Sequence, residues 1–344
     1  MPTYRSGLVE AVLSERSGLQ KVTVDLGGAG PEKAYVLTGL VGSVAVGDDV
    51  VVNTTAVDLG LGSGGWHVVH WNLTRRTWVG PSGGHVMKLR YTSLQADTGA
   101  AEEVEGYEPP SDLGGRPVVA CFLHSQVPIV AAAFAAHAPG RRLVYVMTDG
   151  GALPLALSDV VHGLRCAGLL AATVSTGHAF GGDHEAVNVA SGLDVAVAVA
   201  GADAVVVGTG PGVVGTGTGR GTSSLEVASV LDAAAQSGAR PVVAVRFSEA
   251  DPRERHRGVS HHVSGALAAT HNRVVVPFPA GERPHPMPPA LTHHDLHSIP
   301  DLPPVHDLLQ EAGLTVTTMG RGIADDPAFF RWTAAAGAAA AALL

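Results

Sequence analysis

The stretch RPVVACFLHSQVPIVAAAFAAHAPGRRLVYVMTDGG, residues 116–151, contains one complete β–α–β unit. PVVACFL (117–123) and RLVYVM (142–147) are uninterrupted apolar runs, and the helical segment 126–138 lies between them. Strands that are apolar on both sides are typical of a parallel sheet covered by helices on both faces. This stretch therefore predicts an α/β fold.

The same alternation continues after residue 151. Further apolar runs occur at 168–174, 203–208, 241–247, 273–277 and 314–319, and the helical segments between strands are 158–166, 184–201, 223–238, 261–271 and 303–312. Crossover helices between parallel strands predict a doubly wound, mostly parallel sheet domain over residues 116–330. The Pro- and His-rich segment 279–304 is predicted to be a long surface loop. The Ala-rich tail, 331–344, is predicted to form either a terminal helix or a frayed end.

Residues 1–95 are predicted to form a small β-rich, barrel-like domain. Short runs rich in valine and aromatic residues are separated by glycine-containing turns, with no helical period: 18–26, 33–40, 49–53 and 66–73. Residues 96–115 are acidic, poor in large aliphatic residues and contain a Pro pair. They are the best candidate for a linker.

Composition excludes several classes of protein. The chain is 46% hydrophobic and 15% charged, typical of a packed globule. No uncharged apolar run reaches the roughly 20 residues of a membrane span, and the N-terminus has no signal-peptide pattern. Cys121 and Cys166 lie in apolar stretches, are interpreted as core residues and fit a reducing, cytoplasmic location. A net charge of −9 repels phosphate backbones, so neither a nucleic acid nor a membrane is an expected partner.

Polar and glycine residues follow almost every predicted strand of the α/β domain. In open parallel sheets, ligands bind outside the carboxyl ends of the strands. His124, Asp149 and Arg321 follow such runs within two residues, His178 follows within four, and Arg246 lies at the end of its run. We therefore expect a ligand site at this edge of the sheet.

The loop GTGPGVVGTGTGRGTSS, 208–224, is the strongest single motif. It follows a strand and opens a helix, with Ser223 and Glu226 spaced as a capping box. Glycines let backbone N–H groups approach an anion. GPGVVG (210–215) matches G-x-G-x-x-G, but the helix starts too late for a dinucleotide fingerprint, and no Walker lysine is present. The loop predicts a small anionic or phosphorylated ligand; the alternative is a merely flexible connection. The candidate ligand-binding residues of the loop are Gly210, Gly212, Gly215, Thr216 and Gly217.

A second motif, TGHAFGGDHEAVN (176–188), gathers His178, Asp183 and His184 in a glycine-rich strand-to-helix turn. These residue types transfer protons or bind a divalent metal ion. They are candidate catalytic residues, with Asp149 as a fourth, and candidate metal ligands. The alternative is a capped turn in which Asp183 is the N-cap of the helix, because no established zinc spacing is present.

A third motif, RFSEADPRERHRGVSHH (246–262), follows a strand beside the glycine loop. Arg246 can pair bidentately with a carboxylate or phosphate, and Ser248 follows it as a further ligand-binding candidate. Ser260 is spaced to cap the helix that begins at His261, which is a further candidate metal ligand. A solvated loop is the alternative for the charged run 253–257.

These three strings, together with MKLRYTSLQ (87–95), resemble an uncharacterised actinobacterial protein family of unknown function. The similarity extends over almost the whole chain. It implies a bacterial cytoplasmic protein of the same two-part construction, and it implies no activity and no catalytic residue.

The sequence leaves three functional hypotheses. The first is an enzyme, or a ligand-dependent protein with an enzyme-like pocket, that binds a small anionic ligand through the glycine loop and Arg246. The second is a non-catalytic module that senses a metabolite or docks a partner protein. The third is a metal-dependent hydrolase, for which a divalent metal is an open cofactor option. A homodimer is the base-rate expectation, since twofold dimers are the commonest oligomers.

Overall fold

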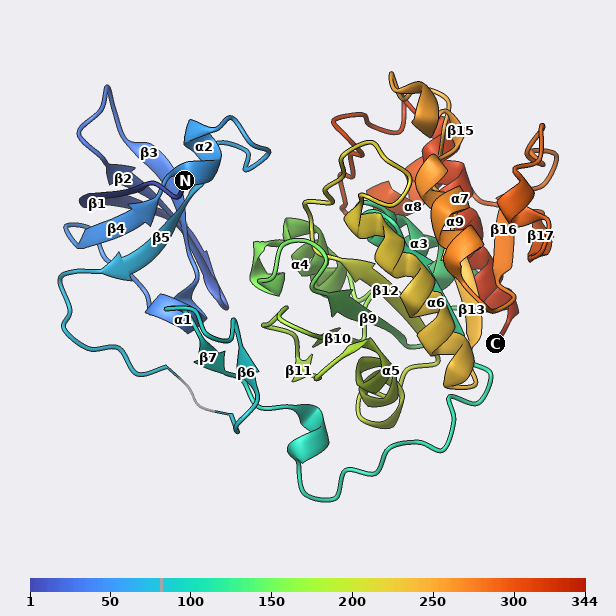
Figure 1. Cartoon of the computed structure of the whole chain (residues 1–344), viewed down its shortest axis with the longest axis horizontal. Helices are drawn as coiled ribbons and strands as arrows, with labels where there is room; N and C mark the ends of the chain where they lie inside the picture. The colour runs from blue at the N-terminus through green and yellow to red at the C-terminus, as the bar shows by residue number, and fades with distance from the viewer. Residues whose placement is uncertain (81–82) are drawn as a thin grey trace. The chain divides into compact units, whose positions relative to one another are not determined.

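The computed structural model describes residues 1–80 and 83–344, which divide into two compact units, Met1–Thr98 and Gly99–Leu344 (Figure 1). The first unit is a closed five-stranded barrel with strand order β1-β2-β3-β5-β4, as the barrel-like interpretation of its sequence predicts. Its strands are β1 (Tyr4–Arg16), β2 (Leu19–Asp25), β3 (Glu32–Val36), β4 (Asp49–Asn53) and β5 (His67–Asn72). Two short helices, α1 (Thr38–Val41) and α2 (Thr55–Asp58), lie in its connections, and a small ribbon of β6 (Met87–Lys88) and β7 (Ala96–Asp97) follows.

The barrel is closed over a valine core. Along β2 the side chains alternate, so that Val22 and Val24 are fully buried while Lys21 and Thr23 are only partly covered. Val50 and Val52 of β4 bury their side chains against the same core. β-branched side chains suit such pleated surfaces, so the valine alternation specifies both the strands and their register.

The second unit is built on an eight-stranded sheet in which every pairing is parallel, with order β11-β10-β9-β12-β8-β13-β16-β17. This confirms the predicted doubly wound α/β domain. The strands are β8 (Pro117–Cys121), β9 (Leu143–Thr148), β10 (Ala172–Ser175), β11 (His184–Glu185), β12 (Ala204–Thr209), β13 (Arg240–Ala244), β16 (Val275–Pro279) and β17 (Asp295–Ile299). All residues of β8, β9 and β12 are buried, as continuous apolar runs require.

Helices cover both faces of this sheet (Figure 1). One face packs against α5 (Val189–Ala198), α6 (Glu226–Gln236) and α7 (His261–Ala269). The other packs against α3 (Gln126–His137), α4 (Asp159–Cys166) and α9 (Pro327–Ala342), with α8 (Val305–Glu311) beside α3. Alternate residues of each strand therefore enter two separate apolar layers. In the described part of the chain, no helix is long and apolar enough to cross a membrane.

The Ala-rich end of the chain forms the second half of α9 and is buried against α3. At Gly337 the two helices approach so closely that a Cβ would clash with the carbonyl oxygen of Val130 and lie 2.9 Å from Cβ of Ala133. The glycine inside the alanine run is thus required by a helix crossing, and small side chains allow α9 to lie close to the sheet.

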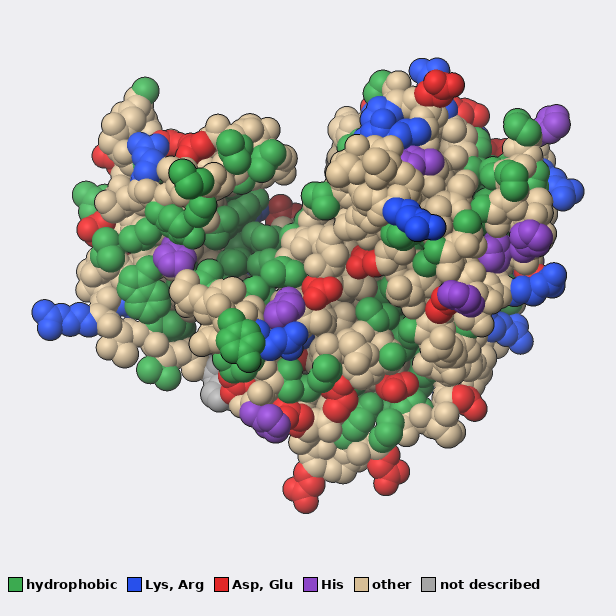
Figure 2. Space-filling view, in the orientation of Figure 1, with side chains coloured by type: hydrophobic (Ala, Val, Ile, Leu, Met, Phe, Trp, Pro, Cys, Tyr) green, Lys and Arg blue, Asp and Glu red, His purple; other side chains and the backbone are tan. Residues whose placement is uncertain are grey.

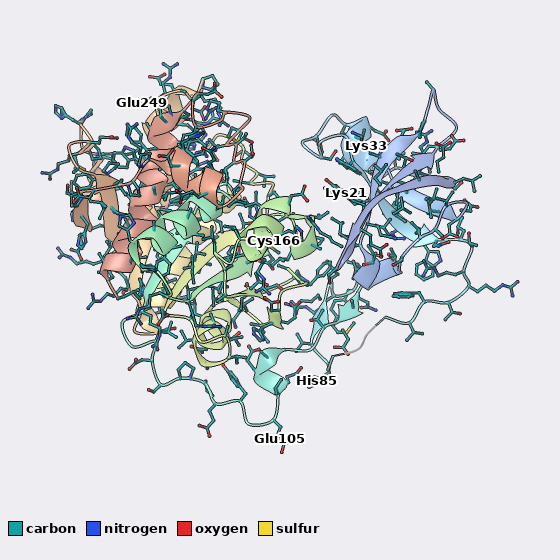
Figure 3. All side chains as sticks on the ribbon, turned by 180° about the vertical axis from the view of Figure 1, so that it is seen from behind. Lys21, Lys33, His85, Glu105, Cys166 and Glu249 are labelled. Carbon is teal, nitrogen blue, oxygen red and sulfur yellow. The ribbon has the colours of Figure 1, made fainter. Side chains whose placement is uncertain are left out.

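Five local predictions are wrong. Residues 314–319 form no strand; the last strand is β17, inside the segment predicted to be a surface loop. The helix expected over 184–201 begins at Val189, because His184 and Glu185 pair with β10 instead. Its N-cap is Asn188, not Asp183. Cys121 is buried as expected, but Cys166 is exposed at the end of α4 (Figure 3).

Candidate functional site

The carboxyl ends of the strands form the edge at which the sequence predicts a ligand. Neighbouring strands β9 and β12 lead away in opposite directions: β9 continues through α4 to β10, and β12 through α6 to β13. Ligands of open α/β sheets usually bind where the chain changes direction in this way. The loops after β9, β10, β12 and β13 all lie at this edge.

The loops after β9 and β12 pack together through glycines. A Cβ at Gly151 would clash with the carbonyl oxygen of Gly210, and a Cβ at Gly210 would clash with that of Ala152. The N–H of Ala152 donates to the carbonyl of Pro211 at 2.8 Å. Gly210 therefore anchors the start of the glycine loop on its neighbour, a packing role that is independent of any ligand.

Glu226 opens α6 and does not close the predicted capping box. The hydroxyl of Thr222 caps the short 3-10 turn Ser223–Leu225, and the Thr148 hydroxyl donates to Oε1 of Glu226 at 2.9 Å. Burial raises the pKa of Glu226, the Thr148 hydrogen bond lowers it, and the charge of Asp149 raises it further. Since an acidic side chain already occupies the first turn of α6, the dipole at this N-terminus is compensated from within the protein.

The structure brings Asp149 and His178 together at the carboxyl ends of β9 and β10. Oδ2 of Asp149 accepts the backbone N–H of His178 at 2.9 Å. Gly177, with φ +62°, leaves the space that this carboxylate fills, because a Cβ there would clash with Oδ2 of Asp149. Asp149 is exposed and His178 is half-buried, so both candidate proton-transfer groups lie at the predicted edge.

Asp183 and His184 lie in a different environment. Asp183 accepts two hydrogen bonds from Arg165, at 2.6 and 3.0 Å, and two from the backbone N–H and hydroxyl of Thr173. His184 belongs to β11 and pairs with Val174 of β10. The Asp183 carboxylate thus ties the outermost strand to α4, and a metal ion would have to displace Arg165 from it.

The glycine loop folds back on itself. Gly215 bridges to Thr222, and the N–H of Thr216 donates to the carbonyl of Gly221 at 2.8 Å. Gly212 and Gly217 have φ values of +104° and +86°, which favour glycine. In the described parts of the chain, the backbone N–H groups of Gly217 and Gly219 make no hydrogen bond.

The loop after β13 is organised around Arg246 and two buried carboxylates. Arg246 is only 4% exposed and lies 3.5 Å from Oδ2 of Asp251. Asp251 also accepts two hydrogen bonds from the side chain of Arg253, both at 2.9 Å, and pairs with Arg321 at 3.4 Å. Arg321 pairs in turn with Asp326. Arg321 therefore reaches this site although it follows no strand.

Ser248, predicted to bind the ligand, has its hydrogen-bonding capacity used within the protein. Its hydroxyl donates to Oδ2 of Asp326 at 2.6 Å and accepts the N–H of Asp251 at 3.0 Å. Ser248 is buried, and so are both aspartates. Its role in the structure is to join the loop after β13 to the start of α9.

Three histidines meet beside Arg246. The ring centroids of His256, His261 and His262 lie 4.4 to 4.9 Å apart, and one ligand atom of each lies within 4.8 Å of the others. Ser260 is the N-cap of α7, as predicted, and its hydroxyl also hydrogen-bonds Nδ1 of His256 at 2.8 Å. Basic and histidine side chains lie together at this end of the second unit, over β15 (Gly258–Val259) and the start of α7 (Figure 2).

Burial and the neighbouring arginines set the charges here. Burial, then the charge of Arg246, lowers the pKa of His256 to about 3 and that of His262 to about 4. Burial, then the charge of Arg255, lowers the pKa of His261. Burial, followed by repulsion from Arg253, lowers the pKa of Arg246 to about 10. Near pH 7 the histidines are therefore neutral while Arg246 is charged.

Within the described ranges, 1–80 and 83–344, these three histidines are the group with metal-ligand spacing. His261 was a predicted ligand, whereas His256 was not among the candidates. Their sequence signal is R-H-R followed by S-H-H: His256 and Ser260 are four residues apart, and two consecutive histidines begin a helix.

A buried serine–histidine pair was also missed. Nε2 of His124 lies 2.7 Å from Oγ of Ser158, and Nδ1 lies 3.0 Å from the carbonyl oxygen of Thr209. Ser158 is the N-cap of α4 and accepts the N–H of Val161. Both polar side chains are buried and satisfied, so the pair links the loops after β8, β9 and β12.

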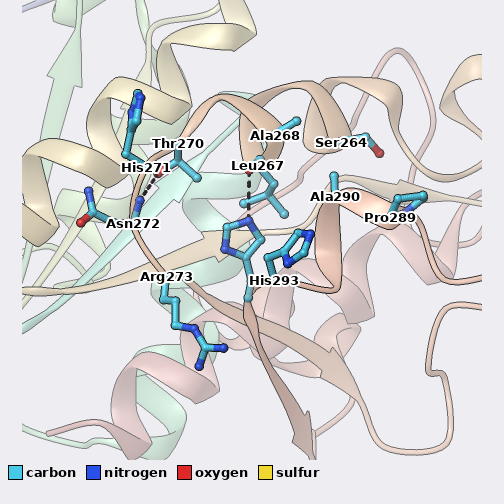
Figure 4. Close-up of a pocket in the computed structure, with 11 residues that line it drawn as sticks. Ser264, Leu267, Ala268, Thr270, His271, Asn272, Arg273, Pro289, Ala290 and His293 are labelled. Atoms are coloured by element: carbon cyan, nitrogen blue, oxygen red, sulfur yellow. Dashed lines mark hydrogen bonds between the residues drawn. The ribbon is translucent and has the colours of Figure 1, made fainter.

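A cavity of about 660 Å³ lies along α7, away from the carboxyl edge (Figure 4). The second half of α7 lines one side, and Pro289 and Ala290 line the other. His294 lies in its wall and hydrogen-bonds the carbonyl of Leu267 at 3.1 Å. Neither the glycine loop nor Arg246 lines it.

Comparison with known proteins gives a family and no function. A family model described as "Protein of unknown function (DUF3866)" matches residues 33–337. No curated protein and no solved structure matches the chain. The match includes the last three strands of the barrel and nearly all of the α/β unit, and the chain therefore belongs to DUF3866, a family of unknown function.

Proposed function

We propose that the carboxyl edge of the α/β unit binds a small anionic ligand, such as a phosphorylated metabolite, beside Arg246. The observation that carries this proposal is an excess of positive charge in a mostly enclosed place. Three arginines converge there on two buried carboxylates: Arg246, Arg253 and Arg321 on Asp251 and Asp326. The charge of the exposed Arg255 also acts on the buried Arg246. A bound anion would relieve the repulsion among the guanidinium groups, which is largest for a buried charge.

The hydrogen bond between Arg246 and His262 favours an anion over a cation. Nη1 of Arg246 lies 3.3 Å from Nδ1 of His262. Because arginine has no acceptor, Nδ1 must be the acceptor, and the ring hydrogen of neutral His262 is on Nε2. His262 thus offers a donor, which suits an oxygen anion.

The glycine loop supplies further donors. A Cβ at Gly217 would lie 4.0 Å from Cζ of Arg255, and one at Gly265 in α7 would lie 3.4 Å from the carbonyl oxygen of Gly219. The tip of the loop is therefore next to Arg255 and the middle of α7. Backbone N–H groups of glycines beside guanidinium groups are a common arrangement for phosphate binding.

The test is ligand-induced stabilisation of the untagged full-length protein by inorganic phosphate, with chloride at equal ionic strength as the reference. At a hundred times Kd, a ligand of the folded state stabilises it by about 2.7 kcal/mol. We expect Arg246→Ala to abolish the rise in Tm that phosphate causes. Arg255→Gln, at an exposed position, should weaken phosphate binding by about tenfold to hundredfold, the loss of one charge-assisted hydrogen bond.

The matched control is Arg273→Gln, which removes an exposed arginine paired with Asp295, a partner outside this site. It should leave the phosphate shift unchanged. An equal shift in wild type, Arg246→Ala and Arg255→Gln would contradict the proposal. Asp149 and His178 are the proton-transfer candidates if the bound anion is a substrate, and a sensing module would bind the same anion without consuming it.

A second candidate function, a metal-dependent hydrolase, is favoured by the three-histidine group. His256 and His261 offer imidazole nitrogens, and His262 would join them by exchanging its contact with Arg246. Elemental analysis of the untagged protein tests it. Near-stoichiometric zinc or another transition metal, lost in His261→Ala and kept in His271→Ala, would place this candidate above simple anion binding.

A further inference from the structure

The outer face of the barrel carries a cluster of aromatic and basic side chains. Tyr35 of β3 and Trp66, the residue before β5, stack with ring centroids 4.6 Å apart and planes at 17°. The ammonium groups of Lys21 and Lys33 lie 5.7 and 5.5 Å from the centroid of the Trp66 ring. Figure 3 labels both lysines on the barrel.

The register of the strands explains why these side chains meet. Lys21 of β2 is paired with Tyr35 of β3, and Lys33 is two residues before Tyr35 on the same face. The intervening residues Val22 and Ala34 point into the core and are fully buried. The alternation of the strands thus assigns the two lysines and the tyrosine to the outside of the barrel.

The topology places this cluster on a surface that other barrels use for ligands. The order β1-β2-β3-β5-β4, with a helix between β3 and β4 and a parallel pairing of β3 with β5, is that of the OB fold. In that fold, the face of the second and third strands and the loops 1–2 and 4–5 bind oligonucleotides or oligosaccharides. Trp66 ends the loop between β4 and β5.

The charge of the barrel permits an anionic partner. Residues 1–98 contain eight basic and eight acidic residues, so the net charge of −9 belongs to the second unit. Glu32, which precedes Lys33 on β3, is engaged by Arg5 and His67. The repulsion inferred from the whole chain therefore does not extend to this surface.

We infer that this face binds single-stranded nucleic acid. A base would stack on Trp66, and the ammonium groups of Lys21 and Lys33 would move from the ring to the flanking phosphates. Aromatic platforms flanked by cations bind single strands with little sequence preference, because every base has a π-face. A neutral sugar would use the aromatic rings and gain little from the two lysines, so the charge favours a nucleic acid over an oligosaccharide.

The test is fluorescence anisotropy of a labelled eight-nucleotide oligo-dT with the full-length protein at several salt concentrations. With two phosphates neutralised, log K should fall with log[salt] at a slope of roughly −1.4. Trp66→Leu should weaken binding by about tenfold to hundredfold, as expected for the loss of one stacked base. The double variant Lys21→Gln/Lys33→Gln, whose substitutions are on the surface, should flatten the salt dependence.

Trp78→Leu is the matched control, since Trp78 also stacks under a cation, Arg75, but belongs to a different segment of the unit. It should bind the oligonucleotide as wild type does. Equal binding by wild type and Trp66→Leu would overturn the inference. So would a preference for a neutral oligosaccharide, such as cellohexaose, over oligo-dT. Phosphate stabilisation of the α/β unit is a separate measurement, so either proposal can fail alone.

Discussion

Gly151→Ala tests the packing that positions the glycine loop. The added methyl group would point at the carbonyl oxygen of Gly210, and it would lie 2.5 Å from Oγ1 of Thr209 and 3.0 Å from the carbonyl oxygen of Pro211. Two of these three atoms belong to backbone, so the loops must separate. Overpacking of this kind costs about 1–3 kcal/mol. In a unit of this size, each kcal/mol lowers Tm by about 2–4 °C, and we expect a decrease of roughly 2–12 °C.

Scanning calorimetry of the full-length protein measures this decrease, with far-UV circular dichroism to confirm the fold. Gly219→Ala is the control: it lies in the same loop, and nothing lies within 4 Å of its added Cβ. Its stability should stay within about 0.5 kcal/mol of wild type. Displacement of the loop should also reduce the phosphate-induced rise in Tm of Gly151→Ala. If both variants melt with wild type, the contact between the β9 and β12 loops does not anchor the site.

Three further predictions concern single side chains. Because the pKa of Glu226 is raised above its usual 4.5, the folded state loses stability as pH rises from that value through the raised pKa. Glu226→Gln should remove this part of the fall of Tm with pH, and a pH dependence of Tm equal to that of wild type would refute the assignment. Gly337→Ala gains about 1 kcal/mol of helix propensity but overpacks α3 against α9, which costs about 1–3 kcal/mol, so its denaturation midpoint should fall. A midpoint at or above that of wild type would contradict the close approach of α3 and α9 at Gly337. In the native protein only the thiol of Cys166 should react with a disulfide reagent, and both thiols should react after unfolding, since Cys121 is buried and burial raises its pKa. Rapid reaction of two thiols in the native protein would disprove the burial of Cys121.

The sheet was predictable wherever strands are covered on both faces. The apolar runs at 117–123, 142–147 and 203–208 became β8, β9 and β12, because burial from both sides demands continuous apolar residues. The edge strand β17 escaped prediction: its sequence DLHSI is half-exposed and as polar as a loop. The apolar segment 314–319 was mistaken for a strand because it buries Val316 without pairing to the sheet.

Local signals at helix ends gave mixed results. Ser260 was correctly predicted to cap α7, since a serine hydroxyl before a helix bonds its first N–H groups. Asp183 and Glu226 had the same kind of spacing but found stronger partners elsewhere, Arg165 and Thr148. A side chain with both local and distant partners available cannot be assigned from spacing alone.

The sequence by itself determined the central strands, most crossover helices and the gathering of polar residues at the carboxyl edge, because all three follow from short-range periodicity and from the direction of parallel strands. Only the tertiary structure decided which polar residues meet. Asp251 and Arg321 are 70 residues apart, and Ser248 and Asp326 are 78 apart. Their pairing depends on where α9 docks, which close helix packing decides.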